Sequence, residues 1–250
     1  MKKVFVFDLD DTLMTNVHDY AQSILDMARI IIEQLGAKAP HVSAVIALEE
    51  EIDKRRVHEI NPITGHKFLY SMERFPGTMV QTYREICQRV RVEPDKLVEK
   101  ELYKIGMQAF DPARYKGNIF PEAIPTIYFL DSQGDTPMLL SKGDQRVQSK
   151  KFSAISAGNN FFRARIVDDK TPQVFKEMKR GYENDVFYSV GNDYEKDIVP
   201  ALEAGYKGIL IPAETWEVIG RTDQILAKVD RSKCFVFNCL GELKERYGEL

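Results

Sequence analysis

The chain has 250 residues, of which 44% are hydrophobic and 29% charged, a composition ordinary for a globular protein with an ample core. Its 35 basic and 38 acidic side chains leave a net charge of −3, which argues against a dedicated nucleic-acid surface. The sequence has no run approaching the roughly 18 consecutive apolar residues of a membrane span. We therefore expect neither a nucleic-acid nor a membrane partner.

The first residues, 1–3 followed by an apolar run, superficially suggest a secretory signal. Asp8 and Asp10 would interrupt its hydrophobic region, and no small-residue cleavage site follows, so the sequence argues against such a signal. The cysteines are odd in number and lie in apolar surroundings, as is typical of reduced core residues. They are Cys87, Cys234 and Cys239. These features predict a cytoplasmic protein.

The first predicted element is a buried strand over Val4–Phe7, a continuous run of β-branched and aromatic residues. It runs directly into the carboxylates of Asp8, Asp10 and Asp11. Buried carboxylates are costly unless they are paired or bound to a metal, and at the carboxyl edge of a parallel sheet a divalent cation and a ligand usually meet that cost. A two-residue step along extended backbone points Asp8 and Asp10 the same way, whereas Asp11 is predicted to cap the following turn.

Helical periodicity dominates the next hundred or so residues, with little strand signal. The predicted helices are 19–35, 43–57, 77–90 and 94–107. Gly36 supplies a stop signal for the first helix, and Pro94 suits the first turn of the last one. Residues 61–65 and 111–117 are loops by composition.

Strands and helices alternate in the rest of the chain. The predicted helices there are 123–130, 172–179, 195–204 and 241–250, and the predicted strands are 138–140, 163–167, 185–190 and 208–211. This spacing predicts an α/β protein with a Rossmann-like parallel sheet and helices on both faces, formed by residues 1–16 and 117–250. Residues 17–116 form an inserted α-helical domain in this prediction. Trp216 and the aromatic run 235–237 are predicted to serve packing.

The segment from Asp8 to Leu13, DLDDTL, resembles motif I of the haloacid dehalogenase (HAD) superfamily, whose phosphatase branch has DxDxT at this position. The resemblance implies that Asp8 is a nucleophile, that Asp10 is a general acid and base, and that Thr12 steadies the loop. The position of the helical block, just after motif I, is similar to the layout of superfamily members with a helical cap of the C1 type. It implies that residues 17–116 are such a cap.

Two later strand ends resemble motifs II and III of the same superfamily. Ser141 follows an apolar strand, and the resemblance implies that its hydroxyl and the amide of Lys142 hold a phosphoryl group, as do the amides of Leu9 and Asp10. Neutral donors of this kind suit transferring oxygens. Lys170, two residues before a proline that opens a helix, resembles the motif III lysine, whose ammonium neutralises phosphate and nucleophile.

The segment that begins Val190-Gly191-Asn192-Asp193 resembles motif IV, which completes a magnesium site. Many superfamily members have Asp directly after the glycine, where this chain has Asn192. Two alignments stay open. Either Asn192 is a neutral ligand with Asp197 behind it, or Asp193 is the direct ligand and forms a pair with Asp197. Hard oxygen donors make both chemically sound for Mg²⁺.

Together the motifs imply a magnesium-dependent hydrolase that cleaves a small phosphorylated metabolite through an aspartyl-phosphate. Asp8, the Asp10 carbonyl and the motif IV loop are the implied metal ligands, and Asp8, Asp10 and Lys170 the implied catalytic groups. The alternatives are a phosphomutase on the same scaffold, a haloacid dehalogenase, or a regulatory protein with little or no catalysis. Dehalogenases of the superfamily lack the second Asp of motif I, so Asp10 argues against that activity. The sequence leaves the metabolite and the oligomeric state open.

Overall fold

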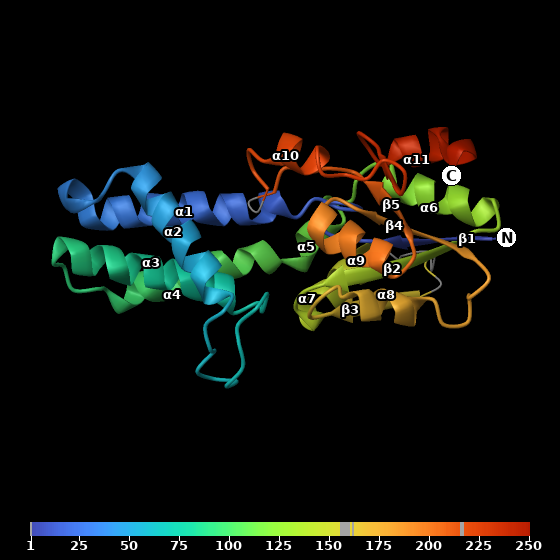
Figure 1. The fold of residues 1–250 in the computed structure, drawn as a ribbon. Helices are drawn as coiled ribbons and strands as arrows, with labels where there is room; N and C mark the ends of the chain where they lie inside the picture. The colour runs from blue at the N-terminus through green and yellow to red at the C-terminus, as the bar shows by residue number, and fades with distance from the viewer. Residues whose placement is uncertain (1, 156–160, 162, 216–217) are drawn as a thin grey trace. The chain divides into compact units, whose positions relative to one another are not determined.

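The computed structural model describes residues 2–155, 161, 163–215 and 218–250, so Trp216 lies outside the described residues. The chain divides into two compact units (Figure 1). Met1–Val17 and Ala113–Leu250 form one of them, which we call the sheet unit, and His18–Pro112 form the other, the helical unit. The boundaries expected from the sequence, 16/17 and 116/117, differ from these by one and four residues.

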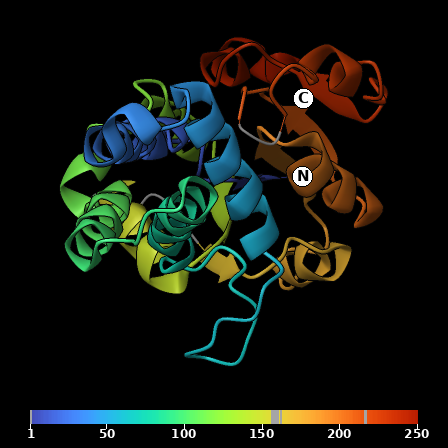
Figure 2. The ribbon, with the colours of Figure 1, turned by 90° about the vertical axis from the view of Figure 1, so that its left-hand side faces the viewer.

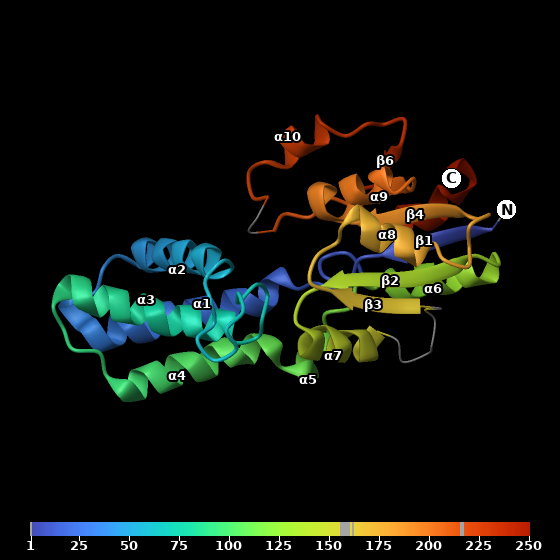
Figure 3. The same cartoon turned by 60° about the horizontal axis from the view of Figure 1, so that its bottom comes forward.

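The sheet unit is built on a parallel sheet of six described strands, in the order β3-β2-β1-β4-β5-β6. Figure 3 shows β3, β2, β1 and β4 side by side. The strands are β1 (Lys3–Phe7), β2 (Thr136–Lys142), β3 (Arg163–Val167), β4 (Val186–Gly191), β5 (Lys207–Leu210) and β6 (Cys234–Val236). The predicted α/β class is confirmed. β6 was not predicted as a strand.

The strand order reverses beside β1. From β1 the chain builds outward through β2 and β3, and then returns to place β4 on the other side of β1. Ligands of open α/β sheets bind at the carboxyl ends of the strands at such a reversal. The carboxyl ends of β1 and β4 are therefore the place to look for a site.

Side chains of β1 alternate between the two faces of the sheet. Val4 and Val6 pack with Phe175 and Ala201, from the helices that follow β3 and β4. Phe5 stacks on Tyr188, with ring centroids 5.0 Å apart. Burial of each such side chain contributes about 1.5–3 kcal/mol, so the central strand is fixed from both sides.

The sheet unit holds short helices around this core. They are α6 (Ala123–Ser132), α7 (Gln145–Ile155), α8 (Pro172–Met178), α9 (Val199–Glu203), α10 (Thr222–Leu226) and α11 (Gly241–Glu245), with turns η3 (Tyr194–Ile198) and η4 (Tyr247–Glu249). Two of these, α7 and α10, were not predicted. The expected single helix 195–204 is instead a π-helical turn, η3, followed by α9, and the expected helix 241–250 ends at Glu245.

Four longer helices make up most of the helical unit, seen from one end in Figure 2. They are α1 (Val17–Leu35), α2 (Val42–Arg56), α3 (Arg74–Val90) and α4 (Lys96–Met107), with short turns η1 (Gly36–Lys38) and η2 (Gln108–Phe110) and α5 (Pro112–Tyr115) at the return. Apolar side chains from α1 to α4 share one core. Asp95 caps α4, accepting from the N–H of Leu97 at 2.7 Å, so the prediction that Pro94 lies in its first turn was wrong. None of the described helices is long and apolar enough to span a membrane.

A close approach of α3 and α4 gives a test of the packing. A Cβ added at Gly106 of α4 would lie 2.6 Å from Cα of Pro76 in α3. We expect Gly106→Ala to lower the free energy of unfolding by about 1–3 kcal/mol, because the helices must separate. Helix propensity alone would favour alanine by about 1 kcal/mol, so the sign is diagnostic. Chemical denaturation followed by circular dichroism measures it.

The matched control is Gly248→Ala, where an added Cβ would meet no heavy atom within 4 Å. That variant should stay within about 0.5 kcal/mol of the wild type. Equal or greater stability of Gly106→Ala would contradict the packing described for α3 and α4.

Candidate active site

Asp8 lies directly after β1, at the strand end where the order reverses. Its backbone N–H donates to the carbonyl of Val190 in β4 at 2.8 Å, and the residue is 9% exposed. The sheet thus fixes the backbone of Asp8 between the two strands. Its carboxylate is placed in a site with little solvent, where charges interact strongly.

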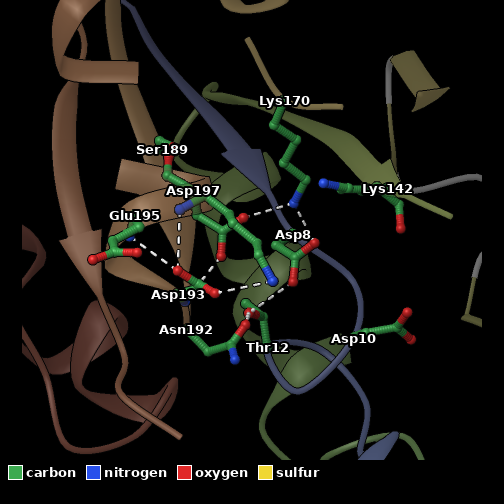
Figure 4. A network of polar contacts seen from close by, with 12 residues as sticks. Asp8, Asp10, Thr12, Lys142, Lys170, Ser189, Asn192, Asp193, Glu195 and Asp197 are labelled. Atoms are coloured by element: carbon green, nitrogen blue, oxygen red, sulfur yellow. Dashed lines mark hydrogen bonds and ion pairs between the residues drawn. The ribbon is translucent and has the colours of Figure 1, made fainter. Parts of the chain in front are cut away.

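The ammonium of Lys170 holds two carboxylates at once (Figure 4). It donates to Oδ1 of Asp8 and, at 2.7 Å, to Oδ1 of Asp197. Lys170 precedes Thr171, whose hydroxyl caps α8 by accepting from the N–H of Val174. The start of α8 therefore fixes the loop from which Lys170 reaches the end of β1. All three charged side chains are buried.

Thr12 joins Asp8 to the motif IV loop. Its hydroxyl lies 3.3 Å from Oδ2 of Asp8 and 3.2 Å from Oδ1 of Asn192. A hydroxyl has one proton, so it can satisfy only one of these two acceptor oxygens at a time. The Asp8 carboxylate and the Asn192 amide thus share one hydroxyl and keep a lone pair that a cation could use.

Asp193 has a different partner set from Asn192. Its Oδ1 accepts from the N–H groups of Glu195 and Lys196, at 2.9 and 3.0 Å, and so caps η3. Its own N–H donates to Oδ2 of Asp197 at 3.0 Å. Figure 4 shows Asn192 beside Thr12, and Asp193 turned toward η3. Of the two alignments left open by the sequence, this arrangement favours Asn192 as the residue that faces Asp8.

Gly191 makes the approach of Asp197 possible. A Cβ at this position would overlap the side chain of Asp197, including its carboxylate. The hydroxyl of Ser189, two residues earlier in β4, donates to the backbone carbonyl of Asp197 at 2.8 Å. The end of β4 thus fixes the backbone of Asp197 and leaves room for its carboxylate, which binds Lys170.

The electrostatics of this buried group are unbalanced, because one ammonium serves two carboxylates. Burial raises the pKa of Asp8 to about 7; Lys170 opposes the rise, and Asp197 and Asp10 add to it. Burial alone would lower the pKa of Lys170, but Asp197 and Asp8 outweigh it, so that pKa lies above its ordinary value. The excess of negative charge favours the binding of a further cation.

Asp10 lies in a second polar network. Its Oδ1 accepts from Nζ of Lys151 at 2.7 Å, and its Oδ2 accepts from Nε2 of Gln148 at 2.8 Å. Gln148 also accepts, through Oε1, from the hydroxyl of Ser141 at 3.1 Å. The predicted proton carrier and the predicted phosphate-binding hydroxyl are therefore linked through a residue that the sequence did not single out.

The other predicted site residues take less direct positions. The Lys142 ammonium donates to Oδ1 of Asp169 at 2.7 Å. Asp169 directly precedes Lys170 in the sequence. The side chain of Leu9 is fully buried in the core, so a role in binding phosphate falls to its backbone. Asp11 accepts from the N–H groups of Asn16 and Val17, which is the predicted capping role.

Sequence reasoning missed Gln148 and Lys151, both on α7. Both residues are buried, at 5% and 2% exposure, on a helix whose inward face also includes Val147 and Ile155. A Gln and a Lys on that face break the apolar periodicity from which a buried helix is predicted. Burial of a lysine is the signal, and it is visible only in the structure.

The described residues include no group of three or more His, Cys, Asp or Glu side chains arranged to hold a metal ion. The side-chain oxygens around Asp8 come instead from the hydroxyl of Thr12, the amide of Asn192 and, across Lys170, the carboxylate of Asp197. Mg²⁺ is commonly bound through one or two carboxylates together with water and substrate phosphate. The donor set fits that ion, and it would suit Zn²⁺ poorly because nitrogen and sulfur ligands are missing from the set described here.

Comparison with known proteins identifies the fold. No family model matches the sequence, and no curated protein matches it. A haloacid dehalogenase-like family hydrolase from Xanthomonas campestris matches with a TM-score of 0.66 and 16% identity, over 99% of this chain and 95% of the other. YfnB from Bacillus subtilis, a HAD-hydrolase bound to magnesium, matches with a TM-score of 0.57 and 14% identity over 99% of both chains.

A HAD phosphatase from Thermococcus onnurineus matches with a TM-score of 0.56 and 16% identity, over 99% of this chain and 98% of the other. The matched structures also include 2-haloacid dehalogenases. At these identities the likeness establishes the fold, and it agrees with the resemblance found in the sequence motifs. The chain has the fold of the haloacid dehalogenase-like hydrolases.

Proposed function

We propose that the protein is a magnesium-dependent phosphohydrolase that cleaves a small phosphomonoester through an aspartyl-phosphate on Asp8. The observation that supports this most directly is the pairing at the end of β1. Asp8 is buried against Lys170 and Thr12, while Asp10, two residues on, is held separately by Gln148 and Lys151. These separate partners support a nucleophilic role for Asp8 and a proton-carrying role for Asp10.

In the first step a carboxylate oxygen of Asp8 forms a bond to phosphorus. The bond between phosphorus and the ester oxygen breaks, and the leaving oxygen takes a proton from Asp10. Lys170 stabilises negative charge on the transferring phosphoryl group and on Asp8. The Ser141 hydroxyl now donates to Gln148, so it would have to exchange that partner in order to donate to the phosphoryl group.

In the second step a water molecule attacks phosphorus and gives a proton to Asp10. The bond between phosphorus and Asp8 breaks, which releases inorganic phosphate, restores the carboxylate of Asp8 and leaves Asp10 protonated. Asp10 thus ends the cycle in the protonation state in which it began. Asp10 thus acts as the acid for the leaving alcohol and later as the base for the attacking water.

Asp8, Asn192 and the backbone carbonyl of Asp10 would hold Mg²⁺. The oxygens of Asp8 and Asn192 that share the Thr12 hydroxyl, and the excess negative charge around Lys170, support this assignment. Bound there, the ion would offset the repulsion between phosphate and nucleophile, and would keep Asp8 ionised at neutral pH.

A haloacid dehalogenase is the alternative that the matched structures raise, because some of them are enzymes of that kind. Such an enzyme needs one attacking carboxylate. The second carboxylate, Asp10, and the polar partners built around it favour phosphoryl chemistry. A phosphomutase would share every residue named here, and release of inorganic phosphate separates it from a hydrolase.

The first test is phosphate release from p-nitrophenyl phosphate and a panel of phosphorylated metabolites in the presence of Mg²⁺. We expect Asp8→Asn to lower kcat by at least about 10³-fold, because the nucleophile is lost. Asp10→Asn should lower it by about 10²–10⁴-fold, through loss of proton transfer. The matched control is Asp11→Asn, which keeps the capping oxygen and should retain activity within a few-fold.

Substantial turnover by Asp8→Asn would contradict the assignment of Asp8 as the nucleophile. Halide release from a 2-haloacid by a wild-type protein that releases no phosphate would favour the dehalogenase. Inactivity in both assays would favour a regulatory protein.

The second test concerns the metal. Asn192→Asp adds a charged ligand beside Asp8, so we expect the half-saturating Mg²⁺ concentration to fall about tenfold. The rise in melting temperature on adding Mg²⁺, which needs no substrate, should grow accordingly. Without Mg²⁺ the same variant should melt below the wild type, because three carboxylates then share one ammonium.

The comparison variant is Asp193→Asn, which alters the cap of η3. It should change stability by up to about 1 kcal/mol and leave the response to Mg²⁺ close to that of the wild type. The reverse pattern, with the response lost in Asp193→Asn and unchanged in Asn192→Asp, would assign the metal to Asp193 instead.

A further inference from the structure

Helix α7 buries two polar side chains, Gln148 and Lys151, that no motif accounts for. They are three residues apart and so lie on the same face of the helix. Lys151 is 2% exposed and Gln148 is 5% exposed. A lysine is almost never buried this deeply without a specific partner, because the loss of hydration is costly.

The partner of both side chains is the carboxylate of Asp10. Lys151 binds one of its oxygens and Gln148 binds the other, at 2.7 and 2.8 Å. Two bonds to two different oxygens fix the plane of a carboxylate as well as its position. We call Gln148 and Lys151 the Asp10 clamp.

Each member of the clamp is itself anchored by another part of the sheet unit. The Lys151 ammonium also donates to Oδ1 of Asn16, at 2.5 Å, and lies 5.8 Å from the ring centroid of Tyr115. Gln148 accepts from Ser141 at the end of β2. The clamp therefore ties Asp10 to β2, to α7 and to the segment that follows motif I.

The loop between β2 and α7 leaves room for the clamp. Gly143 has a φ of +144°, and an added Cβ would lie 2.9 Å from Nε2 of Gln148, the atom that donates to Asp10. Its N–H donates to the carbonyl of Val167 at 3.2 Å, which holds the loop close to β3. A side chain at position 143 would displace the Gln148 amide from Asp10.

We propose that Gln148 and Lys151 are positioning residues for the proton transfers of Asp10. The inference rests on the proposed function. In the arrangement described, both oxygens of Asp10 accept hydrogen bonds, so this is the form that takes a proton from water. The protonated form gives up one of the two bonds, and the other keeps the carboxyl group in place.

A positioning role predicts an effect that depends on the leaving group. Cleavage of an alkyl phosphate requires protonation of a poor leaving group, whereas p-nitrophenolate leaves with little help. The parameter kcat/KM covers steps up to loss of the leaving group, so it isolates the transfer in which Asp10 acts as an acid. Misplacement of Asp10 should therefore lower kcat/KM for glycerol phosphate more than for p-nitrophenyl phosphate.

The experiment compares Gln148→Met and Lys151→Met with the wild-type protein on these two substrates with Mg²⁺. We expect the ratio of the two kcat/KM values, alkyl over aryl, to fall by about 10–100-fold in each variant. Both constants come from one preparation, so the ratio does not depend on the folded fraction. Gln148→Glu keeps the acceptor for Ser141 but removes the donor to Asp10, and it should show a similar fall.

The matched controls make the same chemical changes on exposed positions of the same helix. Gln145→Met and Lys150→Met should leave the ratio within about twofold of the wild type. A second control asks whether the clamp acts through Asp10. Adding Gln148→Met to Asp10→Asn should lower the ratio no further than Asp10→Asn alone.

An unchanged ratio in Gln148→Met and Gln148→Glu, with an active wild type, would overturn the inference and leave the proposed function standing. So would equal further losses in the Asp10→Asn background. If the wild type released no phosphate from either substrate, the proposed function would fail and the inference with it. If Lys151→Met gave no soluble protein, the two Gln148 variants would decide the result.

Discussion

A single buried ammonium organises the carboxyl edge of the sheet. Lys170 donates to the carboxylate of Asp8, directly after β1, and to that of Asp197, in the turn after β4, and its loop is fixed by the start of α8. Burying three charges is costly, and removing one partner from such a group is more costly still. Gly191 leaves room for Asp197, and Ser189 donates to its backbone carbonyl. Both features stabilise the contact between Asp197 and Lys170.

The contact also explains why the site would take a cation and a phosphate. With two carboxylates on one ammonium, the group is short of positive charge, and the pKa of Asp8 rises as a consequence of its burial. Asn192, which shares the Thr12 hydroxyl with Asp8, brings a neutral oxygen where a carboxylate would deepen the imbalance.

Asp10 has hydrogen-bonding and charge partners of its own. Lys151 neutralises it, and Gln148 connects it to Ser141. Two carboxylates two residues apart can therefore have different roles, because each has its own ammonium. The proposed roles of nucleophile and proton carrier rest on this division of partners as well as on the DxD spacing.

Much of this arrangement could be predicted from short segments of sequence. A continuous apolar strand that runs into acids locates Asp8, and the order of later strand ends locates Ser141, Lys170 and the loop at Asn192. The clamp could not be predicted, because Gln148 and Lys151 are polar and in the sequence of α7 indicate an exposed face of the helix, although both are buried. Nor could the sequence show that Asp193 caps η3 while Asn192 contacts Thr12, because that depends on the path of the loop after β4. The role of the helical unit as a cap stays a prediction.

The central claim is that Asp8 becomes phosphorylated, and the direct measurement is mass spectrometry of acid-quenched protein. The Asp10→Asn variant is the suitable form, because p-nitrophenyl phosphate can still transfer its phosphoryl group while hydrolysis of the intermediate is slowed. We predict a phosphoryl group on the peptide that contains Asp8, in stoichiometric amount and labile to mild base, and none when Asp8→Asn is added. A phosphoryl group on another residue, or its absence from a variant that still releases p-nitrophenol, would contradict the account.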